Sequence, residues 1–223
     1  MTEALLDTCR HHRIIPVAVV DNADRAPGLG RALVAGGLPL IEVTLRTPAG
    51  LAAIAALAAN GGPAAGPQPL VGAGTVLTVA QVDAAVEAGA SFIVSPGYSP
   101  AVVARCLELG VGVLPGVGTA GEMMAAMDQG LAVVKFFPAA QLGGPAGLAA
   151  FAAPFTELSF VPTGGVGLKN LAQYLAMPAV AAVGGSWLVP RRTLAEGDFG
   201  TIEQLVRQAV QAARGDLPGG EQT

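Results

Sequence analysis

A single lysine stands in the middle of a short apolar run. Lys135 follows Val133 and Val134 and precedes Phe136 and Phe137, a pattern typical of a strand that is buried on both faces. Long cations are rarely buried in such strands, so Lys135 either extends its ammonium to solvent or performs chemistry. A nucleophilic lysine must lose its proton, whereas a free lysine has a pKa of about 10.4. Desolvation would favour the neutral amine, and Val133 and Phe137 are expected on the same side of the strand as Lys135.

Two further charged residues belong to an earlier apolar run. Glu42 lies inside residues 40–45, where a carboxylate should be paired, and we expect an ion pair with Arg46 or Lys135. The same carboxylate could move protons as a general acid or base. Arg46 follows the run; it is either a plain surface residue or a planar guanidinium that holds a substrate carboxylate through two hydrogen bonds.

Two glycine-rich turns predict a binding site for phosphate. Each follows an apolar run and leads into a helical pattern, and backbone N–H groups in such turns bind anions. One glycine pair alone is a weak signal, but two such turns after neighbouring strands favour a phosphorylated substrate. The residues concerned are Thr163, Gly164, Gly165, Gly184, Gly185 and Ser186.

An amine, a carboxylate, an arginine and a phosphate site together suggest Schiff-base chemistry on a phosphorylated 2-keto acid. The amine would condense with the ketone and the protonated imine would withdraw electrons, while the carboxylate moves protons as a carbon–carbon bond breaks. This chemistry needs no metal. The histidine pair at residues 11–12 has no neighbour at zinc-ligand spacing, and Cys9 and Cys106 are expected to be reduced thiols.

The elements that must position these residues follow one repeating pattern. Short runs rich in Val, Ile and Leu alternate with alanine-rich stretches of helical period. The eight runs expected to be strands are residues 14–20, 40–45, 70–75, 91–95, 111–115, 132–137, 158–163 and 180–184. Helical patterns include residues 28–35, 49–59, 80–87, 101–109 and 120–127.

This alternation predicts an α/β protein, a single-domain (β/α)8 TIM barrel. An open doubly wound sheet is the alternative, but residues 21–24, after the first strand, lack the glycine-rich turn of a dinucleotide site. In a barrel the active site forms at the carboxyl ends of the strands, where the candidate residues above are expected to meet.

Additional segments are expected at both ends of the barrel. Residues 3–12 read as an extra N-terminal helix that could plug the barrel floor, and residues 202–213 as a last amphipathic helix. We therefore expect one barrel domain over residues 1–213 and a flexible C-terminal tail over residues 214–223. Residues 60–67 are expected to form a loop because they are rich in Gly and Pro.

Composition excludes several classes of function. The chain has 223 residues, of which 52% are hydrophobic and 13% charged, with a net charge of −4 and no Lys/Arg cluster larger than one pair, so nucleic acid is not an expected partner. The longest apolar runs are too short to span a membrane. The first residues lack the pattern of a secretory signal, and a cytoplasmic location is expected.

Six motifs, in this order along the chain, resemble those of the bacterial 2-keto-3-deoxy-6-phosphogluconate aldolases, class I enzymes that use no metal. The resemblance extends over nearly all of residues 14–200. It implies cleavage of the substrate to pyruvate and glyceraldehyde 3-phosphate, the second step of the Entner-Doudoroff route, in a homotrimer. The motifs are residues 42–47, 71–77, 95–97, 135–139, 162–165 and 184–190.

The resemblance also implies roles for particular residues. Lys135 would form the Schiff base, and Glu42 would act as general acid and base, partly through a water molecule. Arg46 and Thr75 would hold the pyruvate carboxylate. The other substrate-binding residues, near the phosphate or shaping the pocket, would be Pro96, Phe137, Thr163, Gly164, Gly165, Gly184, Gly185 and Ser186.

Alternative substrates and functions stay open. Relatives that act on the galactonate epimer tend to carry an arginine just after the first strand, where this chain has Val19, Val20 and Asp21, which favours the gluconate substrate. Many relatives also cleave 4-hydroxy-2-oxoglutarate to pyruvate and glyoxylate. An isomerase or decarboxylase acting on a phosphorylated ligand and a non-catalytic barrel that binds phosphometabolites are the remaining alternatives.

Overall fold

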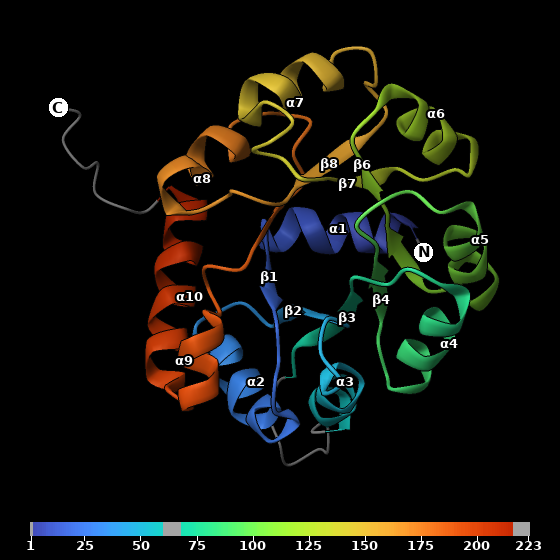
Figure 1. Ribbon diagram of the computed structural model, residues 1–223. Coiled ribbons are helices and arrows are strands. Elements are labelled where there is room, and N and C mark those ends of the chain that lie inside the picture. The colour runs from blue at the N-terminus through green and yellow to red at the C-terminus, as the bar shows by residue number, and fades with distance from the viewer. Residues whose placement is uncertain (1, 60–67, 216–223) are drawn as a thin grey trace, which may run out of the picture.

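Parallel strands curl around one another, and helices surround them on the outside (Figure 1). The computed structural model describes residues 2–59 and 68–215. The loop predicted over residues 60–67 and residues 216–223 of the predicted tail lie outside the described residues. The strands are β1 Ile14–Ala18, β2 Leu40–Thr44, β3 Leu70–Gly74, β4 Phe92–Val94, β5 Gly112–Leu114, β6 Gly116–Val117, β7 Val133–Phe136, β8 Ser159–Pro162 and β9 Val183–Gly185.

The strands form two parallel sheets. One has six strands in the order β5-β4-β3-β2-β1-β9, and the other has three in the order β6-β7-β8. Isolated parallel bridges join Phe160 to Val180 and Thr163 to Gly184, between β8 and the segment of β9. The α/β class and the parallel strand pairing predicted from the sequence are confirmed.

The strand predicted over residues 111–115 is shorter in the structure, and a further strand that the sequence did not predict follows Pro115. The strand before Pro115, β5, pairs with β4, and the strand after it, β6, pairs with β7. Proline has no backbone N–H and cannot donate to a neighbouring strand. Its carbonyl still accepts a hydrogen bond of 2.8 Å from the backbone N–H of Lys135, so Pro115 lies where the chain passes from one sheet to the other.

Several helices begin at a residue whose side chain caps them. Thr78 and Gln81 form a capping box at the start of α4, and Thr119 and Glu122 form another at α6. The Ser99 hydroxyl accepts a hydrogen bond from the backbone N–H of Val102 in the first turn of α5. No described helix is long and apolar enough to cross a membrane. The helices are α1 Thr2–His12, α2 Ala26–Ala35, α3 Gly50–Ala59, α4 Val79–Glu87, α5 Pro100–Leu109, α6 Ala120–Asp128, α7 Gly144–Ala152, α8 Leu168–Leu175, α9 Arg191–Glu196 and α10 Phe199–Arg214, with a short 3-10 turn, η1, over Ala23–Arg25.

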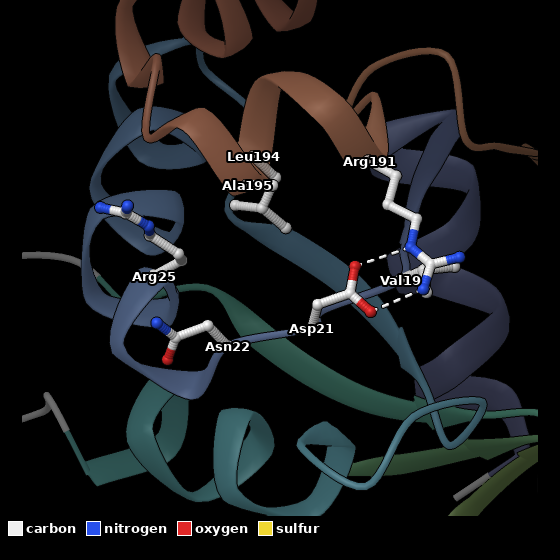
Figure 2. A pocket seen from close by; sticks show the side chains of 7 residues that line it. All are labelled: Val19, Asp21, Asn22, Arg25, Arg191, Leu194 and Ala195. Atoms are coloured by element: carbon white, nitrogen blue, oxygen red, sulfur yellow. Dashed lines mark hydrogen bonds and ion pairs between the residues drawn. The ribbon is translucent and has the colours of Figure 1, made fainter.

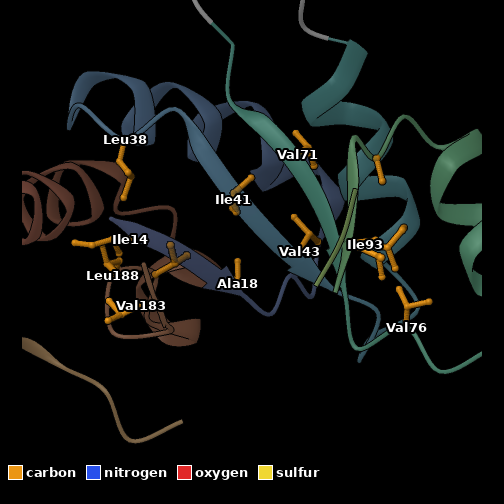
Figure 3. Close-up of a cluster of buried hydrophobic side chains, with 14 of the residues drawn as sticks. Ile14, Ala18, Leu38, Ile41, Val43, Val71, Val76, Ile93, Val183 and Leu188 are labelled. Atoms are coloured by element: carbon orange, nitrogen blue, oxygen red, sulfur yellow. The ribbon is translucent and has the colours of Figure 1, made fainter. Parts of the chain in front are cut away.

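The core has two layers, because successive strand residues point to opposite sides of the sheets. Ile14, Ile41 and Val43 belong to the layer between the strands and the outer helices (Figure 3). Ile15 and Leu40, each one position away in sequence, belong to a second cluster. This second cluster fills part of the space that the curled strands enclose.

Helix α1 covers one end of this inner cluster, as expected for the extra N-terminal helix. Leu5, Leu6 and Cys9 pack there with strand residues that include Phe92 and Leu114. Cys9 is 1% exposed, and burial raises the pKa of its thiol to about 12. The thiol is therefore protonated near neutral pH and acts as a small apolar side chain.

The last turn of α1 predicts a pH dependence of folding stability. Burial and the neighbouring His11 lower the pKa of His12 below its usual 6.5. At pH values between 6.5 and the lowered pKa, the unfolded chain binds more protons than the native protein. The free energy of unfolding therefore decreases as the pH falls through this range. We expect His12→Gln to lose less stability than wild type between pH 7.5 and pH 5, as measured by urea unfolding. An identical pH dependence in both proteins would contradict this.

Candidate active site

A buried ion pair joins the two sheets across the interior. Lys135 Nζ on β7 lies 3.3 Å from Glu42 Oε1 on β2, although the two residues are 93 positions apart in sequence. Lys135 is 5% exposed and Glu42 2%. The sequence left Arg46 and Lys135 open as partners of Glu42, and the structure selects Lys135. A lysine that extends its ammonium into bulk solvent is excluded.

Strand alternation around Lys135 follows the prediction. Val134 and Phe136 pack into the outer layer, and Val133 packs into the inner cluster on the same side as Lys135. Phe137 follows the strand, and its ring centroid lies 5.2 Å from Lys135 Nζ. The amine is therefore bordered by apolar surface and by one carboxylate that lies within reach of its proton.

Gly74 makes room for the carboxylate of Glu42. A Cβ placed on Gly74, at the end of β3, would overlap Glu42 Oε1. Gly74 lies opposite Thr44 in the ladder between β2 and β3, two positions beyond the pair of Glu42 and Gly72. Glycine is therefore required here because the Glu42 side chain extends along the neighbouring strand toward its carboxyl end.

Thr75, the residue after Gly74, has a strained backbone. Its φ is 58°, in the left-handed region that branched side chains rarely adopt. Such a conformation costs on the order of 1–3 kcal/mol and is found most often at functional sites. Thr75 lies at the carboxyl end of β3, beside the end of the strand that carries Glu42, which is where the sequence led us to expect it.

Arg46 lies apart from the buried pair. It is exposed, two residues beyond the end of β2, and within the described part of the chain it makes no hydrogen bond or ion pair. Its neighbour Thr47 donates a hydrogen bond to the carbonyl of Val20, which attaches this loop to the end of β1. The predicted pairing with Glu42 is not formed, and the guanidinium is left available to a ligand.

The two glycine turns lie side by side at the carboxyl ends of β8 and β9. A parallel bridge pairs Thr163 with Gly184, and a Cβ on Gly184 would overlap the Thr163 hydroxyl. Gly164 and Gly165 both have left-handed φ values, 92° and 77°, which glycine adopts readily. Ser186, next to buried Gly185, is exposed. The adjacency expected of these turns is thus present.

Pro96 completes the rim near the lysine. It is half-buried, and its carbonyl lies so close to Gly116 that a Cβ there would overlap it. Gly116 in turn pairs with Lys135 in the ladder between β6 and β7. The hydroxyl of Ser95 donates to the carbonyl of Gly97 at 2.7 Å and so fixes this turn.

The site region contains one buried polar residue, Thr44, that was not among the candidates predicted from the sequence. Thr44 is 3% exposed and lies two positions after Glu42, on the same face of β2. Its hydroxyl donates a hydrogen bond of 3.1 Å to the carbonyl of Ala18. The strand period of two could have identified it.

Among the described residues, no group of three or more His, Cys, Asp and Glu could hold a metal ion.

The buried pair predicts a strong energetic coupling between its members. Removing either partner alone, by Lys135→Met or Glu42→Leu, leaves a buried charge unpaired and should cost about 3–5 kcal/mol of unfolding free energy. The double variant leaves no such charge and should cost much less than the sum. Urea unfolding measures all three. The exposed Arg207–Glu203 pair, 2.6 Å apart, is the control, with an expected cost below about 1 kcal/mol. Additive losses for the buried pair would contradict this prediction.

The amino-acid sequence matches a known protein family over most of its length. Residues 5–205 match the family model described as KDPG and KHG aldolase. A 2-dehydro-3-deoxy-phosphogluconate aldolase of Treponema pallidum is 48% identical over 199 residues, which cover 89% of this chain and 92% of the relative.

Solved structures agree with the sequence comparison. The 2-keto-3-deoxy-6-phosphogluconate aldolase of Zymomonas mobilis, solved with 3-phosphoglycerate, superimposes with a TM-score of 0.85 at 38% identity, covering 94% of this chain and 96% of that one. The KDPG aldolase of Legionella pneumophila, solved with pyruvate captured as a covalent carbinolamine intermediate, gives a TM-score of 0.85 at 37% identity, covering 92% and 97%.

Proposed function

Because this chain belongs to the KDPG and KHG aldolase family, we propose that it is a class I aldolase that cleaves 2-keto-3-deoxy-6-phosphogluconate to pyruvate and glyceraldehyde 3-phosphate. The observation that carries the proposal is the buried contact of 3.3 Å between Lys135 Nζ and Glu42 Oε1. An amine and a carboxylate at this distance can exchange a proton directly. We assign Lys135 as the nucleophile and Glu42 as the general acid and base.

The first stage is formation of the imine. Glu42 accepts a proton from the Lys135 ammonium, and the neutral amine attacks the C2 ketone of the substrate to give a carbinolamine. Loss of water, with a proton returned by Glu42 to the departing hydroxyl, leaves a protonated imine between Lys135 and C2. The Legionella structure described above contains a carbinolamine of pyruvate, which supports the same stage in this chain.

The second stage is cleavage of the carbon–carbon bond. Glu42, directly or through a water molecule, takes the proton of the C4 hydroxyl, and the C3–C4 electron pair moves into the protonated imine. Glyceraldehyde 3-phosphate leaves as the aldehyde, and an enamine of pyruvate stays on Lys135. Proton transfer to C3 and hydrolysis of the imine release pyruvate and restore the amine.

The residues on the rim hold the two ends of the substrate. Arg46, exposed and without a partner in the described chain, would bind the pyruvate carboxylate with Thr75. Pro96 and Phe137 would border the reacting carbons. The adjacent glycine turns would bind the phosphate through their backbone N–H groups, and they comprise Thr163, Gly164, Gly165, Gly184, Gly185 and Ser186.

We further propose that the two sheets act as one (β/α)8 barrel, in a single domain over residues 1–213. The backbone hydrogen bond from Lys135 to Pro115 and the two isolated bridges between β8 and the β9 segment support this closure.

A homotrimer and a cytoplasmic location stay predictions. Light scattering checks the first, since a trimer would have three times the 22.1 kDa mass of the chain.

Trapping of the imine tests the proposed function. Incubation with pyruvate and borohydride should attach pyruvate covalently to Lys135 by reduction of the imine, and mass spectrometry of a digest should locate the added mass on that residue. Lys135→Ala should gain no mass. An unlabelled wild-type protein would refute imine formation.

Glu42→Gln should reduce the rate of cleavage by about 10²–10⁴-fold, because it removes the group that moves the protons.

Product analysis separates the alternative substrates. Pyruvate release should be measured from the two epimeric phosphorylated 2-keto-3-deoxy acids and from 4-hydroxy-2-oxoglutarate. The residues after β1 are Val19, Val20 and Asp21, with no arginine among them, so we expect the gluconate epimer to react faster. Faster release from the galactonate epimer would overturn this preference and leave the imine mechanism intact.

A further inference from the structure

An ion pair outside the proposed catalytic centre links two loops at the carboxyl ends of the strands. Arg191, the first residue of α9, donates from Nε to Asp21 Oδ2 and from Nη2 to Asp21 Oδ1, both at 2.6 Å. Figure 2 shows the two side chains facing each other, while Arg25 points away from Asp21. This is the parallel two-bond geometry in which arginine binds a carboxylate most strongly.

The ion pair lies beyond the end of the parallel ladder between β1 and β9. The ladder between these strands runs from Ile14 and Val183 to Pro16 and Gly185. Pro16 has no N–H to donate. Beyond this point, no other hydrogen bond or ion pair in the described chain joins residues 17–25 to residues 186–198.

The segment between Gly185 and Arg191 carries one wall of the proposed phosphate site. Ser186 is exposed at its start, and the following Leu188 and Val189 are buried at 0% and 2% exposure, which attaches the middle of the segment to the core. Arg191 attaches its far end to Asp21. The segment is thus held at three places, and the last of them is the ion pair to the loop that follows β1.

The loop that carries Asp21 is itself attached to the other end of the proposed substrate site. Val20 is fully buried, and its carbonyl accepts a hydrogen bond from Thr47, the neighbour of Arg46. Asp21 therefore projects from a fixed point. A fixed carboxylate can position Arg191, whereas two mobile side chains would adapt to each other.

We propose that Asp21 and Arg191 form a positioning pair that holds the Ser186 segment for the phosphate of the substrate. The inference rests on the proposed function. In this proposal Arg191 acts through the loop, with its Nε and Nη2 donating to Asp21. The pair is exposed, with side-chain accessibilities of 62% and 42%, and such pairs contribute little to unfolding free energy. Its loss should therefore affect phosphate binding more than stability.

The experiment compares two substrates and one optical signal. Arg191→Ala and Asp21→Asn should raise the KM for the phosphorylated keto acid by about two- to fivefold, the range expected for loss of one good surface ion pair, with kcat nearly unchanged. Exchange of the pyruvate methyl protons with deuterium needs no phosphate and should keep its rate. Trp187, the only tryptophan, adjoins Ser186, so its emission should respond to inorganic phosphate, with a midpoint shifted to higher phosphate in both variants.

Two further proteins serve as controls. Arg192→Ala removes the neighbouring Arg192–Glu196 pair, 2.8 Å apart within α9, and should change neither the KM nor the phosphate midpoint. Exchange of the charges, Asp21→Arg with Arg191→Asp, should recover most of the wild-type KM, whereas each single reversal should not.

Three outcomes would overturn the proposal. They are an unchanged KM and phosphate midpoint in Arg191→Ala, an equal loss in cleavage and in pyruvate exchange, and a wild-type Trp187 emission that does not respond to phosphate. None of these depends on imine formation, because trapping of pyruvate on Lys135 is measured separately. Failure of the positioning pair can therefore be distinguished from failure of the proposed aldolase.

Discussion

The arrangement of this protein depends on one pair of opposite charges kept out of water. Lys135 and Glu42 come from different sheets, and neither charge is stable alone in the apolar interior. Each strand must therefore be placed accurately enough for the two groups to meet. Gly74 is part of the same constraint, because a side chain there would occupy the volume of the Glu42 carboxylate.

The two-layered core supplies the accuracy that the pair needs. Alternate residues of β7 are fixed in opposite directions, with Val134 and Phe136 packed against the helices and Val133 packed inside. A shift of one residue in register would turn Lys135 toward the outer helices. The apolar residues on both sides of the lysine thus determine where the amine points.

Local pattern was enough to predict much of this fold and of the candidate site. Strand period and helix period located the main elements, and a lone lysine among apolar residues indicated the proposed nucleophile. Other features depend on contacts that no local pattern records. The additional strand β6 after Pro115 and the choice of Lys135 over Arg46 as partner of Glu42 are both set by tertiary packing. The alternation predicted a helix between the sixth and seventh strands without giving its bounds; this helix, α7, begins with Gly144 and Pro145, residues that are also common in turns.

Helix α1 has a consequence for the order of events during turnover. Leu5, Leu6 and Cys9 fill the inner space at the end of the strands opposite to the rim that carries Thr75 and Ser186. Helix α1 thus covers this end of the interior, and under the proposed function substrate and products would reach Lys135 from the opposite rim. In the proposed reaction the three pyruvate carbons stay bonded to Lys135 after the aldehyde has formed. Because both products would leave by the same rim, the aldehyde would diffuse away before water reaches the imine and releases pyruvate.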